Sequence, residues 1–182
     1  MKKTFLILFI GLFFIIFFVL SKNQKGKSLK VTQLKSMIKI QSSAFKQGEM
    51  IPEKYTCKGE DINPPLTIEN VPTNAKSLAL IIDDPDAPME TFTHWLLWNI
   101  NPKTKEIKEN SLPAGAILGI NDFGKTAYGG PCPPSGVHRY YFKVYALDII
   151  LDLPAGANRS QLEKAIEGHI LDYAELMGRF QK

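Results

Sequence analysis

From residue 37 onward, the hydrophobic positions fall into short runs that proline, glycine and asparagine interrupt. Each run is rich in apolar, β-branched or aromatic residues, which is typical of β-strands. The expected strands cover residues 38–40, 77–83, 94–99 and 140–147. Residues 77–82 are nearly all apolar, as in a strand that is buried on both faces. The pattern therefore predicts a mainly β domain of the α+β class over residues 37–182.

One helix is predicted, near the C-terminus. Ser160 and Glu163 have the spacing of a capping box, which would start a helix at this point. Apolar residues then recur at steps of three or four and give the segment one apolar face. They are Leu162, Ile166, Ile170, Tyr173, Met177 and Phe180. We expect this helix to pack on one side of the sheet.

A long apolar run precedes the domain. It extends from Phe5 to Leu20, after Lys2 and Lys3. A basic start followed by such a run is typical of a secretory signal, and the run is also just long enough to span a membrane. We predict a signal peptide or signal anchor over residues 1–21 and a lysine-rich tether over residues 22–36. Because lysines are more numerous after the run than before it, a reversed anchor with the domain inside stays open.

The charge balance changes once this leader is set apart. The 182 residues carry a formal net charge of +4, and residues 1–30 hold six lysines and no acidic residue. Removing six positive charges leaves −2 for the remainder of the chain. The basic character therefore belongs to the leader, and the usual inference from basicity to nucleic-acid binding fails. Composition also excludes disordered, collagen-like and multi-pass membrane architectures.

Polar residues cluster where the predicted strands end. Asp84 and Asp86 directly follow the buried strand, on a segment that Pro88 and a second proline stiffen. Alone, such a segment is more often an Asp-rich turn than a site. His94 begins the next strand, where alternation would place it on the same face as Trp98. An isolated histidine is more often part of a core than of a site.

A third cluster, residues 129–140, is the densest. Its glycines allow close backbone approach, and its prolines hold the loop open. It leads into the last strand, which places His138 and Arg139 at the start of that strand. Aspartate and histidine suit acid–base chemistry or the binding of a phosphate.

Motifs for several enzyme classes are absent from the sequence. It contains no phosphate-binding P-loop, no G-x-S-x-G elbow, no H-E-x-x-H and no C-x-x-C. We therefore predict no catalytic residue, no metal site and no cofactor. A hydrolase with Cys132 as nucleophile is a weak alternative, because no helix N-terminus is expected there to lower the pKa of this thiol.

Taken together, these motifs resemble the phosphatidylethanolamine-binding protein (PEBP) family. The signature segments are 84–88, 94–95, 130–131 and 136–140. Residues 55–59, 63–65, 121–124 and 130–134 are similar to the bacterial YbhB/YbcL branch, a Raf-kinase-inhibitor-like group. The resemblance extends from about residue 38 to residue 180 and leaves out the leader.

The resemblance implies an antiparallel β-sheet core with a second small sheet, peripheral helices and a C-terminal helix. It also implies a surface pocket for small anions or phosphorylated head groups. The ligand-binding residues carried over are Asp84, Asp86, Pro88, His94, Gly130, Pro131, His138 and Tyr140. Tyr173 and Met177, on the C-terminal helix, would close over this pocket.

The function implied is non-enzymatic binding of the phosphatidylethanolamine type. The alternative is an inhibitor or modulator of a protein partner such as a protease or a kinase. Because two carboxylates would repel an anion, a zwitterionic phosphoethanolamine would suit the pocket better. The expected partners are this small ligand, an unknown protein and a second copy of the chain, with no nucleic acid. Membrane contact is expected through the N-terminal segment alone.

Cys57 and Cys132 are the only two cysteines. Both would be reduced in a cytosolic protein, whereas export into an oxidising compartment would favour a disulfide between them. Such a bond would join two loops beside the implied pocket. We expect the domain to be periplasmic or secreted, either free or anchored to the inner membrane by residues 5–20. A cytoplasmic location is the less favoured alternative.

Overall fold

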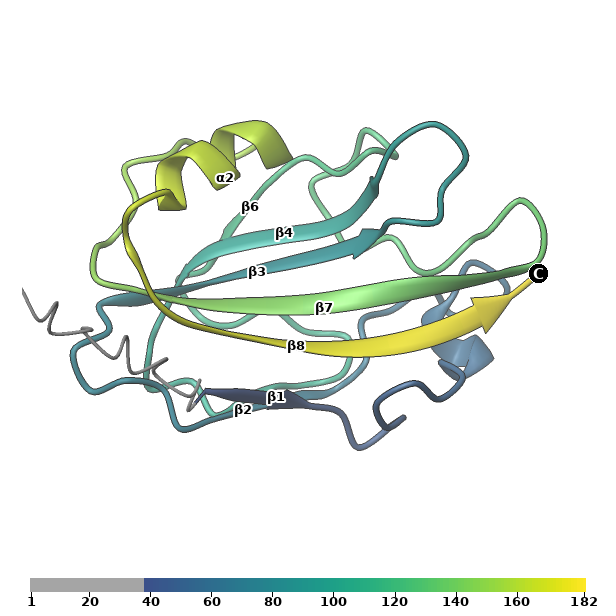
Figure 1. The fold of residues 1–182 in the computed structure, drawn as a ribbon, viewed down its shortest axis with the longest axis horizontal. Coiled ribbons are helices and arrows are strands. Elements are labelled where there is room, and N and C mark those ends of the chain that lie inside the picture. The colour runs from purple at the N-terminus through teal and green to yellow at the C-terminus, as the bar shows by residue number, and fades with distance from the viewer. Residues whose placement is uncertain (1–37) are drawn as a thin grey trace, which may run out of the picture. The chain divides into compact units, whose positions relative to one another are not determined.

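A computed structural model describes residues 38–182 of the chain. The predicted signal or anchor segment (1–21) and the tether (22–36) lie outside the described residues. Two antiparallel sheets and a single α-helix make up the regular structure of the described part, which confirms the mainly β prediction (Figure 1). No helix within residues 38–182 has the length and apolar character needed to cross a membrane.

The larger sheet has five strands in the order β6-β4-β3-β7-β8, and the smaller has three in the order β1-β2-β5. The larger contains β3 (Ser77–Asp84), β4 (Phe92–Ile100), β6 (Ile117–Leu118), β7 (Val137–Leu147) and β8 (Ile170–Gln181). The smaller contains β1 (Lys39–Gln41), β2 (Leu66–Glu69) and β5 (Glu106–Ile107). The helices are the 3-10 helix η1 (Glu53–Tyr55) and α2 (Arg159–Ile166). The four predicted strands correspond to β1, β3, β4 and β7.

β3 is central to the larger sheet, and all eight of its residues are buried. One face, which includes Leu80, packs against apolar residues of the small sheet such as Ile68. The other face, which includes Ile81, packs under Leu162 and Ile166 of α2. Figure 1 shows α2 on one side of the larger sheet, with β1 and β2 on the other. Burial on both sides explains why the sequence of β3 is continuously apolar.

The predicted C-terminal helix is correct only in its first turns. α2 begins after Asn158, whose side chain accepts from the Gln161 amide in a capping box, so Ser160 is not the cap. The helix ends at Ile166, and Gly168 has a positive φ of 79° that turns the chain away. Residues 170–181 then form β8 rather than a helix.

β8 forms because β7 offers it a full-length partner. The two strands pair antiparallel from one end of β8 to the other, and Tyr173 lies opposite Tyr145 while Met177 lies opposite Tyr141. Leu176, Gly178 and Phe180 are buried at alternate positions, so the segment also carries a strand period. The sequence of this segment fits both a helical period and a strand period, and pairing with β7 favours the strand.

The alternation expected around His94 is wrong because β4 contains a bulge. Ile82 pairs with Trp95 whereas Asp83 pairs with Thr93, so His94 is an extra residue in the ladder. The His94 ring contacts Tyr140, which belongs to the core between the two sheets. Trp98 lies in the other core, under α2.

Candidate functional site

A cavity of about 220 Å³ opens where β3 ends, beside the start of β4. Its lining combines one carboxylate, one imidazole and a larger number of apolar groups. The lining residues are Asp84, Ala87, Pro88, Phe92, His94, Phe123, Cys132 and Pro134. The volume is below the usual range for drug-sized ligands and suits a small molecule or a head group.

Asp84 and His138 form a buried pair at this cavity. Asp84 is the last residue of β3, and His138 lies near the start of β7. Asp84 Oδ2 is 2.7 Å from His138 Nδ1, and the two residues are 3% and 8% exposed. Asp84 Oδ1 also accepts a hydrogen bond from the Asp86 amide, as in an Asx turn. Each oxygen of the Asp84 carboxylate therefore accepts a hydrogen bond, and these two bonds fix the orientation of the group.

His94 is held as a neutral imidazole. It is 3% exposed, and its ring packs against Phe92, Phe123 and Tyr140. Burial lowers the pKa of His94, although the Gly129 hydrogen bond and the charge of Asp84 act in the opposite direction. Nδ1 lies 2.7 Å from the Gly129 carbonyl oxygen, so this nitrogen carries the proton. Nε2 is then a hydrogen-bond acceptor.

Asp86 is already engaged by an arginine. Arg139 donates to both Asp86 oxygens, at 2.6 Å through Nη2 and 2.8 Å through Nε, and its backbone amide adds a third bond. The Arg139 hydrogen bonds lower the pKa of Asp86 to about 2. This carboxylate does not line the cavity, and its charge is offset locally.

Tyr140 does not line the cavity but packs against the His94 ring, which does. It is fully buried, and among the described residues its hydroxyl has no hydrogen-bond partner of good geometry. Burial raises the pKa of Tyr140 well above its usual value, and the nearby charge of Asp84 adds to this effect. Its ring meets the His94 ring edge to face, with ring centroids 5.2 Å apart. Tyr140 is therefore one of the contacts that hold the imidazole in place.

Gly130 and Pro131 fix the loop that carries Cys132. The Gly130 amide donates to Asp61 Oδ1 at 2.6 Å, and the Pro131 carbonyl accepts from the Cys57 amide at 3.2 Å. A Cβ atom at Gly130 would lie 2.5 Å from the Tyr55 carbonyl oxygen, so a side chain does not fit there. These two residues position the wall of the cavity rather than form it.

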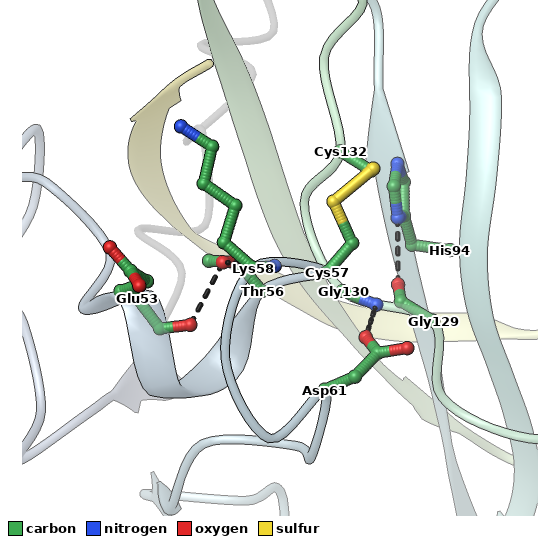
Figure 2. Close-up of a disulfide and its surroundings, with 9 residues drawn as sticks. All are labelled: Glu53, Thr56, Cys57, Lys58, Asp61, His94, Gly129, Gly130 and Cys132. Atoms are coloured by element: carbon green, nitrogen blue, oxygen red, sulfur yellow. Dashed lines mark hydrogen bonds between the residues drawn. A yellow bond between two sulfur atoms is a disulfide. The ribbon is translucent and has the colours of Figure 1, made fainter.

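A disulfide joins Cys57, just after η1, to Cys132, across a sequence separation of 75 residues. Figure 2 shows the bond beside His94, with the Cys132 sulfur on the side of the imidazole ring. Figure 2 also shows the bonds from His94 to Gly129 and from Gly130 to Asp61. Both cysteines are exposed, and Cys132 lines the cavity.

The structure therefore divides the predicted site residues into two groups. Asp84, Pro88 and His94 line the cavity; Asp86, Gly130, Pro131, His138 and Tyr140 surround or support it. Tyr173 and Met177 are not among the lining residues, because β8 replaces the expected helix.

Sequence reasoning missed the two aromatic walls, Phe92 and Phe123. Phe123 lies in the 121–124 motif, which the resemblance does not assign to the ligand-binding residues. Asn121 holds this motif: its side chain donates to the His94 carbonyl at 3.2 Å and accepts from the Phe123 amide at 3.1 Å. An asparagine followed closely by a glycine is a turn signal. The sequence therefore indicates the turn at residues 121–124, but it does not reveal that this turn packs against His94.

Comparisons with known proteins place this geometry in a family. The family model described as phosphatidylethanolamine-binding protein matches residues 41–181. A UPF0098 protein of Pyrococcus horikoshii is 56% identical over 150 residues, which cover 78% of this chain and 75% of the relative. The crystal structure of a PEBP homologue of Chlamydia trachomatis is 41% identical, covers 81% of this chain and 99% of its own, and gives a TM-score of 0.78.

A second solved structure, Escherichia coli YbcL, is 29% identical with a TM-score of 0.76 over the same shares of the two chains. Relatives thus occur in archaea, in Chlamydia and in E. coli, and the likeness to YbcL agrees with the YbhB/YbcL group named from the motifs. The chain belongs to the phosphatidylethanolamine-binding protein family.

Proposed function

We propose that this protein binds a small phosphorylated ligand in the cavity at the end of β3 and does not transform it. The observation that carries the proposal is a small cavity with Asp84 and a neutral His94 in its wall, both buried and fixed in direction. Pre-formed polar groups inside an apolar pocket are typical of small-molecule sites.

The charges around the cavity are less unfavourable to an anion than the two free carboxylates expected from the sequence would be. Arg139 offsets the negative charge of Asp86, and Asp84 is hydrogen-bonded to His138. The repulsion expected from two free carboxylates is therefore reduced, and the cavity rim can tolerate a phosphate group.

The polar atoms in the wall constrain the ligand further. Asp84 oxygens and His94 Nε2 are acceptors, so a ligand in contact with them must bring hydrogens. An ammonium group meets this need, and so does a protonated phosphate oxygen. Phosphoethanolamine, with an ammonium group and a phosphate two carbons apart, carries both features, and we propose it as the ligand class.

Three related ligands test this assignment. Phosphate lacks the ammonium group, and phosphocholine replaces the ammonium hydrogens by methyl groups. In phosphorus NMR titrations, phosphoethanolamine should bind more tightly than either, and Asp84→Asn should remove the preference. Equal binding of phosphate and phosphoethanolamine would exclude the zwitterionic ligand.

We also propose that the domain works outside the cytoplasm, either free or anchored by residues 5–20. The apolar run after two lysines and the disulfide between Cys57 and Cys132 support this location. Cell fractionation combined with alkylation mass spectrometry tests it. Protein in the exported or membrane fraction should carry no free thiol, whereas cytoplasmic protein with two free thiols would contradict the proposal.

A further inference from the structure

The Cys57–Cys132 disulfide is open to solvent at the same cavity that holds His94. We propose that Cys132 is a site of covalent modification, at which a small thiol enters the cavity and forms a mixed disulfide with Cys132 Sγ. The reaction goes beyond ligand binding and requires no anion in the cavity. Exposed disulfides are the ones that exchange readily with thiols in solution.

The direction of attack follows from the position of the two sulfurs. In thiol–disulfide exchange the incoming sulfur attacks one sulfur and expels the other. Cys132 lines the cavity, whereas Cys57 does not. Figure 2 shows the Cys132 sulfur as the one nearer the His94 ring in that view. A thiol inside the cavity therefore meets Cys132 Sγ and displaces Cys57 Sγ from it.

His94 is suited to act as the base for this step. Nδ1 donates to the Gly129 carbonyl oxygen, which leaves the Nε2 lone pair to accept a proton. In Figure 2 the ring nitrogen that is not bonded to Gly129 lies at the end of the ring beside the disulfide. Because the thiolate is the nucleophile, an imidazole that accepts the thiol proton during the attack would assist this step.

The atoms and electrons of the exchange balance without an external oxidant. The S–H proton of the small thiol passes to His94 Nε2, and its sulfur forms a bond to Cys132 Sγ. The Cys57–Cys132 bond breaks, and its electron pair leaves on Cys57 Sγ, which takes a proton from solvent. His94 then returns its proton to solvent. One disulfide and one thiol become another disulfide and another thiol.

The fold can survive this exchange, because other bonds hold the two loops together. The Cys57 amide donates to the Pro131 carbonyl, and the Gly130 amide donates to Asp61. The Tyr128 hydroxyl also donates to the Tyr55 carbonyl at 2.8 Å. With these contacts in place, the freed Cys57 stays close to Cys132, so the exchange is reversible.

The first test identifies the modified sulfur. Oxidised full-length protein is treated with 2-mercaptoethanol under native conditions, quenched with acid, alkylated and analysed by peptide mass spectrometry. The mercaptoethanol adduct should be found mainly on Cys132 and the alkyl label on Cys57. An adduct mainly on Cys57, an equal mixture or no exchange by the folded protein would overturn the proposal.

The second test separates a base from a merely structural histidine. His94→Gln keeps a donor for the Gly129 carbonyl, and it should slow the exchange about tenfold or more. Below pH 8, the exchange rate of this variant should decrease in proportion to the concentration of free thiolate. The wild-type rate should decrease less steeply over the same range, because His94 can accept the proton of the neutral thiol. His169→Gln, a change at a half-buried histidine outside the cavity, should behave as wild type. An unchanged rate and pH profile in His94→Gln would refute the role of His94; should this variant not fold, the position of the wild-type adduct decides.

Discussion

His94 shows how one inserted residue creates a site. The bulge in β4 turns its ring to the side of the sheet that carries Tyr140, where Phe92, Phe123 and Tyr140 contact it. The Gly129 carbonyl then selects the tautomer, and burial selects the neutral form. Each property follows from position, and none is visible in the residue type alone.

This burial predicts a pH dependence of stability. The pKa of His94 is lowered from 6.5 in the folded protein, so below about pH 6.5 the unfolded chain binds a proton that the folded protein does not. Stability from this residue is therefore complete above pH 6.5 and decreases as the pH falls towards the lowered pKa, by at most about 1.4 kcal/mol per pH unit. Urea unfolding of wild type and His94→Gln at pH 7.5, 6.5 and 5.5 measures it. A difference in unfolding free energy that stays constant with pH would contradict this origin.

At the scale of elements, the loop of residues 128–132 packs closely against the segment after η1. Replacing either Gly129 or Gly130 by alanine adds a methyl group, and the two substitutions should differ in their effect on stability. At Gly130 the Cβ would meet backbone atoms of Tyr55 and Thr56, whereas at Gly129 it would meet the Phe123 ring. Backbone cannot move aside, but the half-exposed ring can rotate. We expect Gly130→Ala to lower the free energy of unfolding by about 1–3 kcal/mol.

Gly129→Ala serves as the matched variant and should cost less. Denaturant unfolding of both variants checks the order. If Gly129→Ala were the more destabilising of the two, the close approach of the loop to Tyr55 would not be the controlling contact.

Element assignment also shows where sequence reasoning succeeds and where it fails. The sequence predicts β3 and β7 as strands because their burial is regular along the chain. All residues of β3 are buried, and residues of β7 are buried at alternate positions. The apolar residues of the last segment fit a period of three or four, which predicts a helix. Residues 170–181 form β8 instead, since β7 supplies a pairing partner that local sequence cannot reveal.

The same limit applies to the site. The motifs identified Asp84, Pro88 and His94, which line the cavity, but Phe92 and Phe123 were not expected to contribute walls. The Asp86–Arg139 and Asp84–His138 pairs also depend on the contact between the segment after β3 and the start of β7. The charges at this cavity therefore depend on tertiary contacts that the local sequence does not reveal.

At the scale of the whole molecule, the disulfide links segments that are 75 residues apart in the sequence. A cross-link of this kind restricts the unfolded chain, so replacing both cysteines should lower the free energy of unfolding by about 2–4 kcal/mol. Denaturant unfolding of Cys57→Ser/Cys132→Ser against oxidised wild type measures the loss. Wild type that has been reduced and alkylated should lose a similar amount; an unchanged midpoint in both would show that the link adds no stability.

The central claim is that the cavity at the end of β3 binds a phosphorylated ligand, and calorimetric titration of the oxidised protein tests it most directly. Phosphoethanolamine, phosphate and acetate are titrated into wild type, His138→Ala and the control His169→Ala. The account predicts saturable binding to wild type and to His169→Ala, tightest for phosphoethanolamine, and its loss in His138→Ala. Absence of binding heat with all three ligands, at two temperatures and in a protein shown to be folded, would contradict it.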